Sequence, residues 1–392
     1  MFINKIILLN WKNFQSVEVN LEERVFIVGS NASGKSNFLD AFKFLRDLAK
    51  QAGGLQSAVD DRGGVTKIRC LSARTINDIS ISIELSDSSS RQLLWRYKIA
   101  FKHTGGGITK NAAKIVSEKV ENVSTGEVLL DRNEYTENED SETLKFSHLE
   151  QPGFNQGFRD IYFFLRDLQY LHVVPQLMRE TESYYLASSK EDFYGRNLLE
   201  RIAKTNSSTR ASYLKKINEV LGLAVPQLSG LEFVKDSNKG TPHLEAKYEH
   251  WRPKGARHRE QQFSDGTLRL IGFMWALLDG TETILLEEPE LYLHAAIVRE
   301  LPEFISKMQR KKDKKRQVII TTHSYDLLQT DTISPEEILI IEQSSAGSLV
   351  KSASQIIEVQ TMLEAGFRPA DAVLPRVAPR RITSLHQLSL FE

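Results

Sequence analysis

The order of hydrophobic and polar residues along the chain predicts alternating strands and helices. Residues 2–9 and 17–21 have the composition of strands, and the continuous apolar run at 24–28 predicts a buried strand. Residues 37–49 place apolar side chains at i, i+3, i+4 and i+7, the spacing of a helix with one buried face. We therefore expect a protein of the α/β class.

In the middle of the chain, apolar residues first recur at every second position and then at the spacing of a helix. Alternating apolar and polar residues predict antiparallel strands, at 79–85, at 93–99 and as a pair within 113–130. The acidic stretch 131–142 predicts a loop. Residues 158–221 have helical spacing without sustained heptads, which predicts a compact helical insertion rather than a coiled-coil arm. Strands return at 228–250, ahead of an apolar helix at 270–278.

Composition excludes several classes of protein without selecting one. The chain has 392 residues, of which 41% are hydrophobic and 26% charged, as in globular proteins with a buried core. Its 51 basic and 51 acidic residues balance, so binding to nucleic acid would need a local patch. A single cysteine, Cys70, excludes an intramolecular disulfide and a cysteine-rich metal site. Because no apolar run approaches membrane-spanning length, we expect a cytoplasmic protein without membrane contact.

A G-x-x-x-x-G-K-[ST] sequence lies between the strand at 24–28 and the helix at 37–49. Its glycines let the backbone curl around an anion, and successive N–H groups then point at phosphates at the head of the helix. The lysine would neutralise the β- and γ-phosphates, and the final hydroxyl would ligate Mg²⁺. The alternative is an ordinary Gly/Ser turn, but the flanking strand and helix favour a phosphate loop. Its residues are Gly29, Ser30, Asn31, Ala32, Ser33, Gly34, Lys35 and Ser36, followed by Asn37.

A second polar group lies directly before the apolar helix at 270–278. Its sequence is Phe263-Ser264-Asp265-Gly266-Thr267-Leu268-Arg269. Serine and glycine at a helix N-terminus offer a hydroxyl and N–H groups to a negative ligand. The alternative is a plain N-cap, because helices commonly begin with such residues.

The short apolar strand at 283–286 ends in carboxylates. It leads to Glu287, Glu288, Pro289 and Glu290, the arrangement of a Walker B motif. In that motif the first carboxylate lies near Mg²⁺ and the next orients and deprotonates the attacking water. A solvated acidic loop is the alternative.

Another buried strand, at 317–320, ends in Thr321, Thr322, His323 and Ser324. Lone histidines are usually structural or exposed. The position of His323 at a strand end, shared with the phosphate loop and the two glutamates, favours a γ-phosphate sensor.

In this order the four motifs resemble those of ABC-type ATPases of the RecF, OLD and SMC kind. The resemblance is closest to the compact "AAA family" ATPases of that group found in bacterial genomes and phage-defence operons. Residues 6–14 also resemble their first strand and turn, and the resemblance covers most of residues 1–345. It implies an α/β fold, namely an ABC-type ATPase head with a mostly parallel sheet, an antiparallel β subdomain and a small helical lid insertion.

The resemblance also implies how the chain is divided. We expect an N-terminal ATPase lobe at 1–75, an antiparallel β subdomain at 76–150, a helical lid at 151–227, a C-terminal ATPase lobe at 228–345 and an extension with a flexible tail at 346–392. OLD-family proteins often carry a Toprim nuclease. The residues after His323, about seventy in number and without a D-x-D pair, are too few for that domain, so we expect none.

The resemblance implies ATP and Mg²⁺ as ligands and assigns roles to the second half of the site. The signature residues would bind ATP on an opposing subunit, with the first and third at its γ-phosphate: Ser264, Asp265, Gly266 and Thr267. Glu288 is the implied general base and His323 the switch histidine. Ser36 and Glu287 would stand on the Mg²⁺ side, and because Glu287 replaces the usual Asp, its contact would run through water. Gln56 is a candidate for the Q-loop glutamine.

Charged and terminal segments bear on partners. Two basic groups would either bind phosphate backbones or be solvated loops: Arg252, Lys254, Arg257 and Arg259, and the run at 310–316. A Pro/Arg-rich stretch at 376–381 leads to Gln387, Leu388, Ser389, Leu390 and Phe391, which matches the sliding-clamp motif Q-L-[SD]-L-F. Docking of this tail on its own domain is the alternative.

The sequence thus predicts a Mg-ATP-dependent switch ATPase. It would assemble as a homodimer or higher oligomer through composite ATP sites and couple ATP binding and hydrolysis to DNA or to an effector protein, a nuclease or toxin encoded nearby, in anti-phage defence. Two alternatives stay open. One is a RecF-like repair or replication-associated ATPase recruited by the sliding clamp, and the other is a non-hydrolysing, ATP-dependent scaffold.

Overall fold

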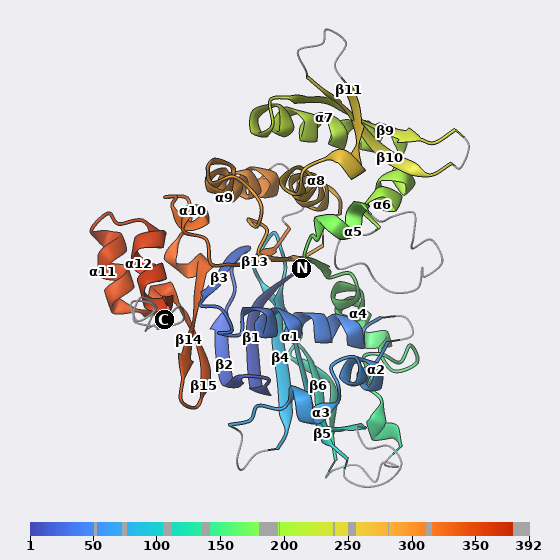
Figure 1. Cartoon of the computed structure of the whole chain (residues 1–392). Helices are drawn as coiled ribbons and strands as arrows, with labels where there is room; N and C mark the ends of the chain where they lie inside the picture. Colours follow the sequence, from blue (N-terminus) through green and yellow to red (C-terminus); the bar gives the residue numbers. More distant parts are fainter. Residues whose placement is uncertain are drawn as a thin grey trace, which may run out of the picture. The chain divides into compact units, whose positions relative to one another are not determined.

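The structure is a computed structural model of the chain, coloured along the sequence in Figure 1. It describes residues 1–50, 53–72, 77–104, 112–134, 142–179, 195, 197–237, 240–249, 256–280, 282–310 and 316–378. The chain divides into two compact units. The first consists of Met1–Gln169, Glu282–Leu285 and Lys314–Glu392, and the second of Tyr170–Thr281 and Leu286–Asp313.

A six-stranded antiparallel sheet forms one layer of the first unit, in the order β2-β1-β4-β5-β6-β7. Its strands are β1 Phe2–Trp11, β2 Phe14–Asn20, β4 Ile79–Ser86, β5 Leu93–His103, β6 Ala113–Asn122 and β7 Glu127–Asn133. The two N-terminal strands therefore belong to the same sheet as the hairpins of the middle segment. Strand β7 also runs into the stretch predicted as a loop. Its last residues carry charge rather than an apolar alternation, and Asp131 pairs across the ladder with Lys119.

The second sheet has the order β15-β14-β3-β13-β12-β8. Its strands are β3 Arg24–Gly29, β8 Gln169–Leu171, β12 Ile284–Glu287, β13 Val318–Thr322, β14 Ile338–Ser344 and β15 Gly347–Ser352. Strands β13 and β14 run parallel to β3, and β15 returns antiparallel to β14. All of β3 is buried, as expected for a central strand of a parallel sheet. The helical prediction for 158–221 was wrong at β8, whose three residues are too few to interrupt a helical period.

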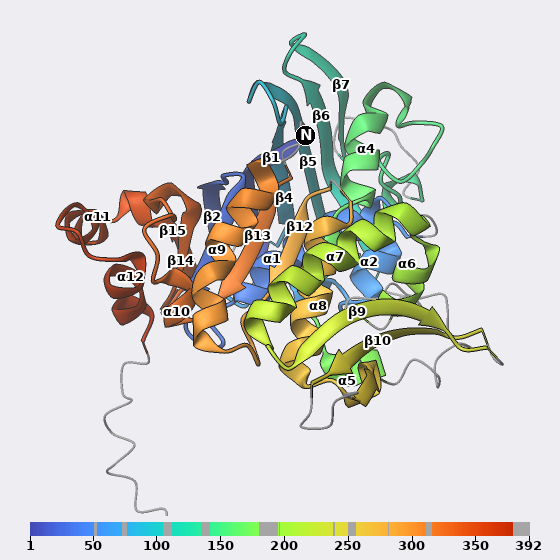
Figure 2. The ribbon, with the colours of Figure 1, turned by 90° about the horizontal axis from the view of Figure 1, so that it is seen from above.

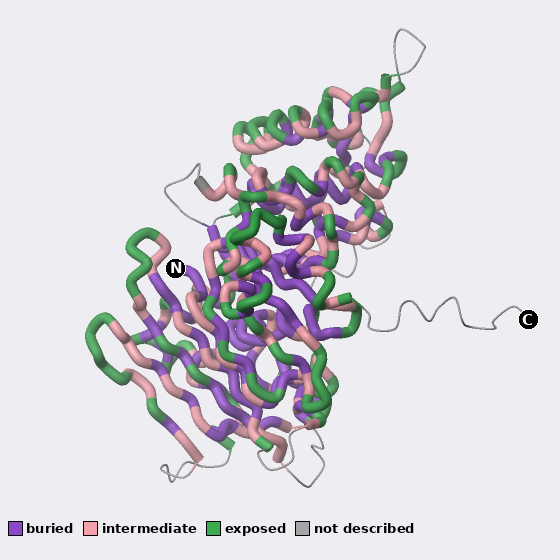
Figure 3. Tube along the Cα trace, turned by 90° about the vertical axis from the view of Figure 1, so that its left-hand side faces the viewer, coloured by how far each residue is buried: buried purple, intermediate pink, exposed green. Residues whose placement is uncertain are grey.

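Helices of the first unit cover these sheets. They are α1 Lys35–Leu48, α2 Leu55–Asp60, α3 Val65–Ile68, α4 Arg159–Arg166, α10 Tyr325–Leu328, α11 Ile357–Glu364 and α12 Pro369–Val377. Helix α1 lies on the antiparallel sheet (Figure 1). Its Phe44 touches Trp11 of β1 edge-on and stacks on Phe101 of β5. In Figure 3 buried positions follow the strands, and exposed positions lie at turns and along the outward faces of helices.

The second unit contains most of the helical insertion and a small sheet. Its helices are α5 Pro175–Arg179, α6 Leu198–Lys204, α7 Ser207–Ala224, α8 Asp265–Leu278 and α9 Ala295–Arg310. Its antiparallel strands β9 Leu228–Lys235, β10 Pro242–Tyr248 and β11 Ala256–Arg259 follow the order β11-β10-β9, with α7 along β9 (Figure 2).

Helix α8 is the buried centre of the second unit, where every residue from Thr267 to Leu278 is buried. It begins at Asp265 rather than at residue 270. Ser264 caps it and so lets the polar signature residues form its first turn.

Short 3₁₀ turns complete the described structure, at Thr143–Lys145, Gln156–Phe158, Glu260–Gln262, Pro335–Glu337 and Ala353–Gln355. Within the described part of the chain, no helix combines the length and hydrophobicity needed to span a bilayer.

Candidate nucleotide site

The phosphate loop joins the end of β3 to the first turn of α1. Lys35 and Ser36 are the first two residues of α1, and the backbone of Gly34 has a φ of 112°. The loop curls so closely that a Cβ on Gly29 would lie 2.3 Å from Ser33 Oγ. Helix α1 therefore presents its N-terminal turn at the mouth of a tight backbone cradle.

Lys35 lies inside this cradle. Its side chain is 7% exposed, and its Nζ donates to the carbonyl oxygens of Gly29 at 2.9 Å and Ser30 at 3.3 Å. Ser36, by contrast, is exposed at the helix end. An ammonium group against the backbone of the loop and an accessible hydroxyl beside it fit a phosphate chain with its Mg²⁺ ion.

Side chains from distant parts of the first unit hold the loop from behind. Asn13, in the turn between β1 and β2, donates to the carbonyl of Ser33 at 2.8 Å, and Ser348 of β15 donates to the same oxygen at 2.6 Å. Asn13 also donates to Ser348 Oγ and accepts from Asn37, both at 2.8 Å. Sequence analysis assigned no role to Asn13 or Ser348, since nothing in their spacing points to the loop.

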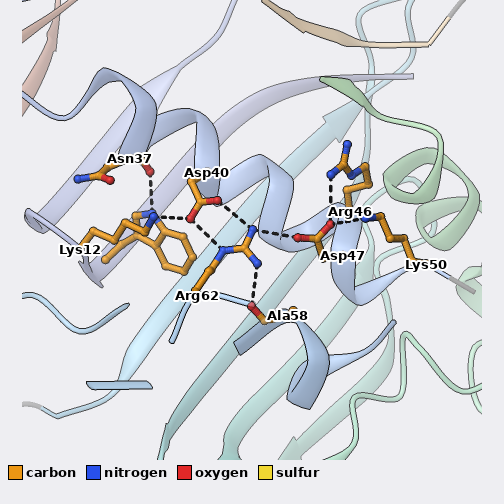
Figure 4. Close-up of polar contacts among 9 residues, drawn as sticks. Lys12, Asn37, Asp40, Arg46, Asp47, Lys50, Ala58 and Arg62 are labelled. Atoms are coloured by element: carbon orange, nitrogen blue, oxygen red, sulfur yellow. Dashed lines mark hydrogen bonds and ion pairs between the residues drawn. The ribbon is translucent and has the colours of Figure 1, made fainter. Parts of the chain in front are cut away.

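A buried charge cluster supports α1 on its other side (Figure 4). Arg62 forms ion pairs with Asp40 at 2.9 Å and Asp47 at 3.0 Å, and Lys12 reaches Asp40 at 2.6 Å. Burial opposes ionisation of Asp40, but the charges and hydrogen bonds of Arg62 and Lys12 outweigh it and lower the pKa of this carboxyl. Burial likewise opposes ionisation of Asp47, and Arg46, Arg62 and Lys50 together lower its pKa. Both carboxylates therefore stay ionised near neutral pH.

His323 lies at the same end of the parallel sheet as the phosphate loop. In the ladder of β13 and β3, Thr322 is paired with Val28, so His323 follows at the level of Gly29. The threonine is fully buried and the histidine exposed. Ser324 caps the next helix by accepting the Leu327 N–H at 3.3 Å. The first unit thus brings together the loop and the histidine predicted as a γ-phosphate sensor.

The signature residues form the first turn of α8 in the second unit. Ser264 Oγ accepts the Thr267 N–H at 3.2 Å and lies 2.8 Å from Thr267 Oγ1, so the N-cap considered from the sequence is present. Helix α5 holds Asp265, whose carboxylate is 2.5 Å from Arg179 Nη2 and accepts from Gln176 at 2.8 Å. The signature therefore has a defined conformation within its own unit.

The acidic segment after β12 also lies in the second unit. Tyr170 of β8 donates its hydroxyl to Glu287 Oε2, and His172 Nδ1 is 3.2 Å from the Glu287 carbonyl. Glu288 is a non-glycine residue with a φ of 43°, and Glu290 is buried at 6% exposure. Glu287 and Glu288 are half-buried, so of the three glutamates only Glu290 is withdrawn from solvent. Tyr170 and His172 were missed, and their only signal was two polar rings spaced for one face of a strand.

Other predicted residues have different surroundings. The amide of Gln56 bonds the backbone of Ala113 and Lys145, so it fastens α2 to its neighbours. Arg257 pairs with Glu232 and Glu245, and Arg259 with Asp236 and Glu245. Arg316 is buried and donates to the carbonyl of Glu282 and to Gln169.

The remaining predicted partner residues lie outside the described part of the chain. They are Arg252, Lys254, residues 311–315 and the tail motif at 387–391. Clamp binding through Gln387, Leu390 and Phe391 stays a prediction.

Comparison with known proteins shows the family and the fold. The family model described as "AAA domain, putative AbiEii toxin, Type IV TA system" matches residues 24–329. The comparison with curated proteins found no match. The chain has the fold of an SMC head, that is, of an ABC-type ATPase head.

Two solved structures carry this fold comparison. One is an Smc head bound to the C-terminal winged-helix domain of ScpA. It is 15% identical with a TM-score of 0.53, over 90% of this chain and 98% of that one. The other is an Smc head with an extended coiled coil, bound to the C-terminal domain of ScpA from Pyrococcus furiosus. It is 12% identical with a TM-score of 0.52, over 93% of this chain and 99% of that one.

Proposed function

Because the chain belongs to this AAA-domain family, we propose that it is a Mg-ATP-dependent switch ATPase whose subunits assemble through composite ATP sites. The observation that carries the proposal is the phosphate loop, a closed backbone cradle at the head of α1 with the buried Lys35 ammonium inside it. Such a cradle has one common use, which is to hold the phosphates of a nucleotide.

Different residues of the first unit bind different parts of the Mg-nucleotide. Lys35 and the N–H groups of the loop hold the β- and γ-phosphates, and Ser36 is the hydroxyl available to the metal. Bound Mg²⁺ would neutralise phosphate charge. His323, exposed at the same sheet end, is placed to sense the γ-phosphate.

The residues of the second unit supply turnover and assembly. Glu288 acts as general base for the attacking water, and Glu287 stands on the metal side, held by the Tyr170 hydroxyl. The signature turn, with Ser264 and Gly266, contacts ATP bound to a neighbouring subunit. ATP binding thereby closes a homodimer or larger assembly, and hydrolysis opens it.

The switch couples ATP binding and hydrolysis to an effector protein, and its role is in anti-phage defence. Among the basic residues predicted to bind phosphate backbones, Arg257 and Arg259 are engaged in ion pairs and Arg316 is buried. For these described residues, phosphate binding would compete with contacts already made, and this favours a protein effector over DNA. An Smc head seated on a ScpA domain offers a precedent for a protein partner on this fold.

The test compares wild type with Glu288→Gln, each with and without double-stranded DNA. We expect slow hydrolysis by wild type that DNA does not change, and a rate about 10²- to 10⁴-fold lower in the variant. Light scattering should show a larger mass with ATP, retained longer by Glu288→Gln. Equal rates for the two proteins would remove Glu288 as the base. A rate raised by DNA would instead support a RecF-like function, and no hydrolysis with ATP-dependent assembly would support a scaffold.

A further inference from the structure

Arg269 is a buried cation to which the proposed function assigns no role. It lies in α8 of the second unit and is 1% exposed. Its Nη2 donates to the carbonyl oxygen of Glu288 at 3.1 Å, and its guanidinium carbon is 5.5 Å from the ring centroid of Tyr292. Within the described residues, its buried Nε has no hydrogen-bond partner. An incompletely bonded buried guanidinium is costly, which points to a role other than stability.

The loop that Arg269 touches has an unfavourable backbone. Glu288 and Tyr292 have φ values of 43° and 64°, a region that side chains other than glycine seldom adopt. Local hydrogen bonds run from the Leu291 N–H to Glu288 O at 3.3 Å and from the Leu293 N–H to Glu290 O at 3.1 Å. Such a conformation persists when its surroundings impose it.

A second contact joins the same loop to α8. A Cβ on Gly266 would lie 2.6 Å from the carbonyl oxygen of Tyr292, so the signature glycine allows the helix and the loop to meet. The loop therefore meets α8 at both ends, at Tyr292 by a close approach to Gly266 and at Glu288 by the hydrogen bond from Arg269.

We propose that Arg269 is a positioning residue that fixes Glu288 to the signature turn of the same subunit. This inference rests on the proposed function. There the signature contacts a neighbour's ATP, while Glu288 acts on the ATP of its own subunit. Because a rigid link joins the signature turn to Glu288, closure of one composite site fixes the position of the general base in the other site. Hydrolysis at the two sites is then coupled through Arg269.

The variants are Arg269→Gln and Arg269→Lys, with Arg201→Gln as the matched control. Arg201 also binds this helix from outside, at its far end, through Asp279 at 2.5 Å. We expect Arg269→Gln to lower kcat at least about 10-fold with KM for ATP within about 2-fold, because binding energy is kept while the base is misplaced. Arg269→Lys should restore part of the rate, and Arg201→Gln should retain it. In the Glu288→Gln background, Arg269→Gln should add no further loss.

Amide hydrogen exchange gives a readout that does not depend on hydrolysis. In Arg269→Gln, with the rest of α8 protected, the N–H groups of Leu291 and Leu293 should exchange faster than in Arg201→Gln. Unchanged exchange in this loop would overturn the inference even in a hydrolysing protein. A change in kcat and KM together by the same factor, with no rescue by lysine, would also overturn it. If wild type fails to hydrolyse ATP, the proposed function is wrong. The exchange measurement still tests whether Arg269 holds the loop of Glu288.

Discussion

The two units of the molecule hold their functional segments in different ways. In the first unit the phosphate loop has several supports, including two side chains that donate to the Ser33 carbonyl and the charge cluster behind α1. In the second unit the loop of Glu288 contains two left-handed residues and is held by Arg269 and the close approach at Gly266. We therefore expect changes in the first unit to appear as lost stability or lost nucleotide binding, and changes in the second as a lower rate or weaker metal binding.

The largest effect should come from the charge cluster of the first unit. Arg62→Met leaves Asp40 and Asp47 without their shared partner, and breaking a buried pair costs about 3–5 kcal/mol. The urea-unfolding midpoint of the variant should fall accordingly. Arg96→Met is the control, because Arg96 is about half exposed in its pairs with Glu84 and Glu121 and should cost about 0–1 kcal/mol. Equal losses of unfolding free energy in the two variants would show that the buried cluster stabilises the unit no more than an exposed ion pair does.

Lys35→Ala should separate binding from stability within the same unit. The lysine would make two or more charge-assisted hydrogen bonds to phosphate, of about 1.5–3 kcal/mol each, so ATP affinity should fall at least about 100-fold. Fluorescent-nucleotide titration measures this loss. Lys50→Ala, a change at the other end of α1 that removes an ion pair with Asp47 at 2.9 Å, should bind ATP as wild type does. Comparable affinity in wild type and Lys35→Ala would contradict the nucleotide site.

A smaller effect concerns pH and again the first unit. Burial raises the pKa of Glu150 to about 7, although the carboxylate accepts the Leu55 N–H at 2.7 Å. A raised carboxyl pKa favours folding in the protonated form, so this stability is present at low pH and is lost as pH rises through about 7. Glu150→Gln should remove about 1–2 kcal/mol of decline in unfolding free energy between pH 5 and 8. Glu142→Gln, exposed in the same segment, should leave the decline in place.

The smallest predicted effect lies in the second unit. Tyr170→Phe removes the hydroxyl that bonds Glu287 and keeps the ring. Loss of a partner of a metal-side ligand typically costs 10- to 100-fold, and we expect about 10-fold in Mn²⁺ affinity, measured by paramagnetic resonance with nucleotide present. Folding and Mg²⁺-free nucleotide binding should be retained. Mn²⁺ binding equal to wild type would show that Tyr170 serves packing alone.

The part of the site that could be predicted from the sequence is the part encoded by neighbouring residues. The phosphate loop has every fixed position within eight residues, flanked by a strand and a helix whose periods are clear. The family and the ABC-type head fold were likewise confirmed. Short polar motifs at strand ends mark the edge of a parallel sheet where ligands bind. The order of these motifs along the chain therefore predicted the fold as well as the site.

The residues that were missed act across long sequence separations. Ser348 reaches the loop from 315 residues away, and Tyr170 reaches Glu287 from 117. Arg269 was visible in the signature, but its contact depends on the left-handed turn at Glu288, which no propensity predicts. Strand β8 and the charged end of β7 were missed because pairing with a neighbouring strand, rather than the local pattern, decides their conformation.

The position of β3 in its sheet has a consequence for synthesis. The strand that leads into the phosphate loop is paired on its two sides with β13 and β14, which the ribosome makes about 300 residues later. Although its motif is complete within the first tenth of the chain, the loop cannot gain its final support until nearly the whole polypeptide has emerged. A nascent or truncated chain that ends before Val318 therefore carries an apolar strand open at both edges, a natural client for chaperones. We therefore expect the proposed nucleotide binding only in chains that extend past β14.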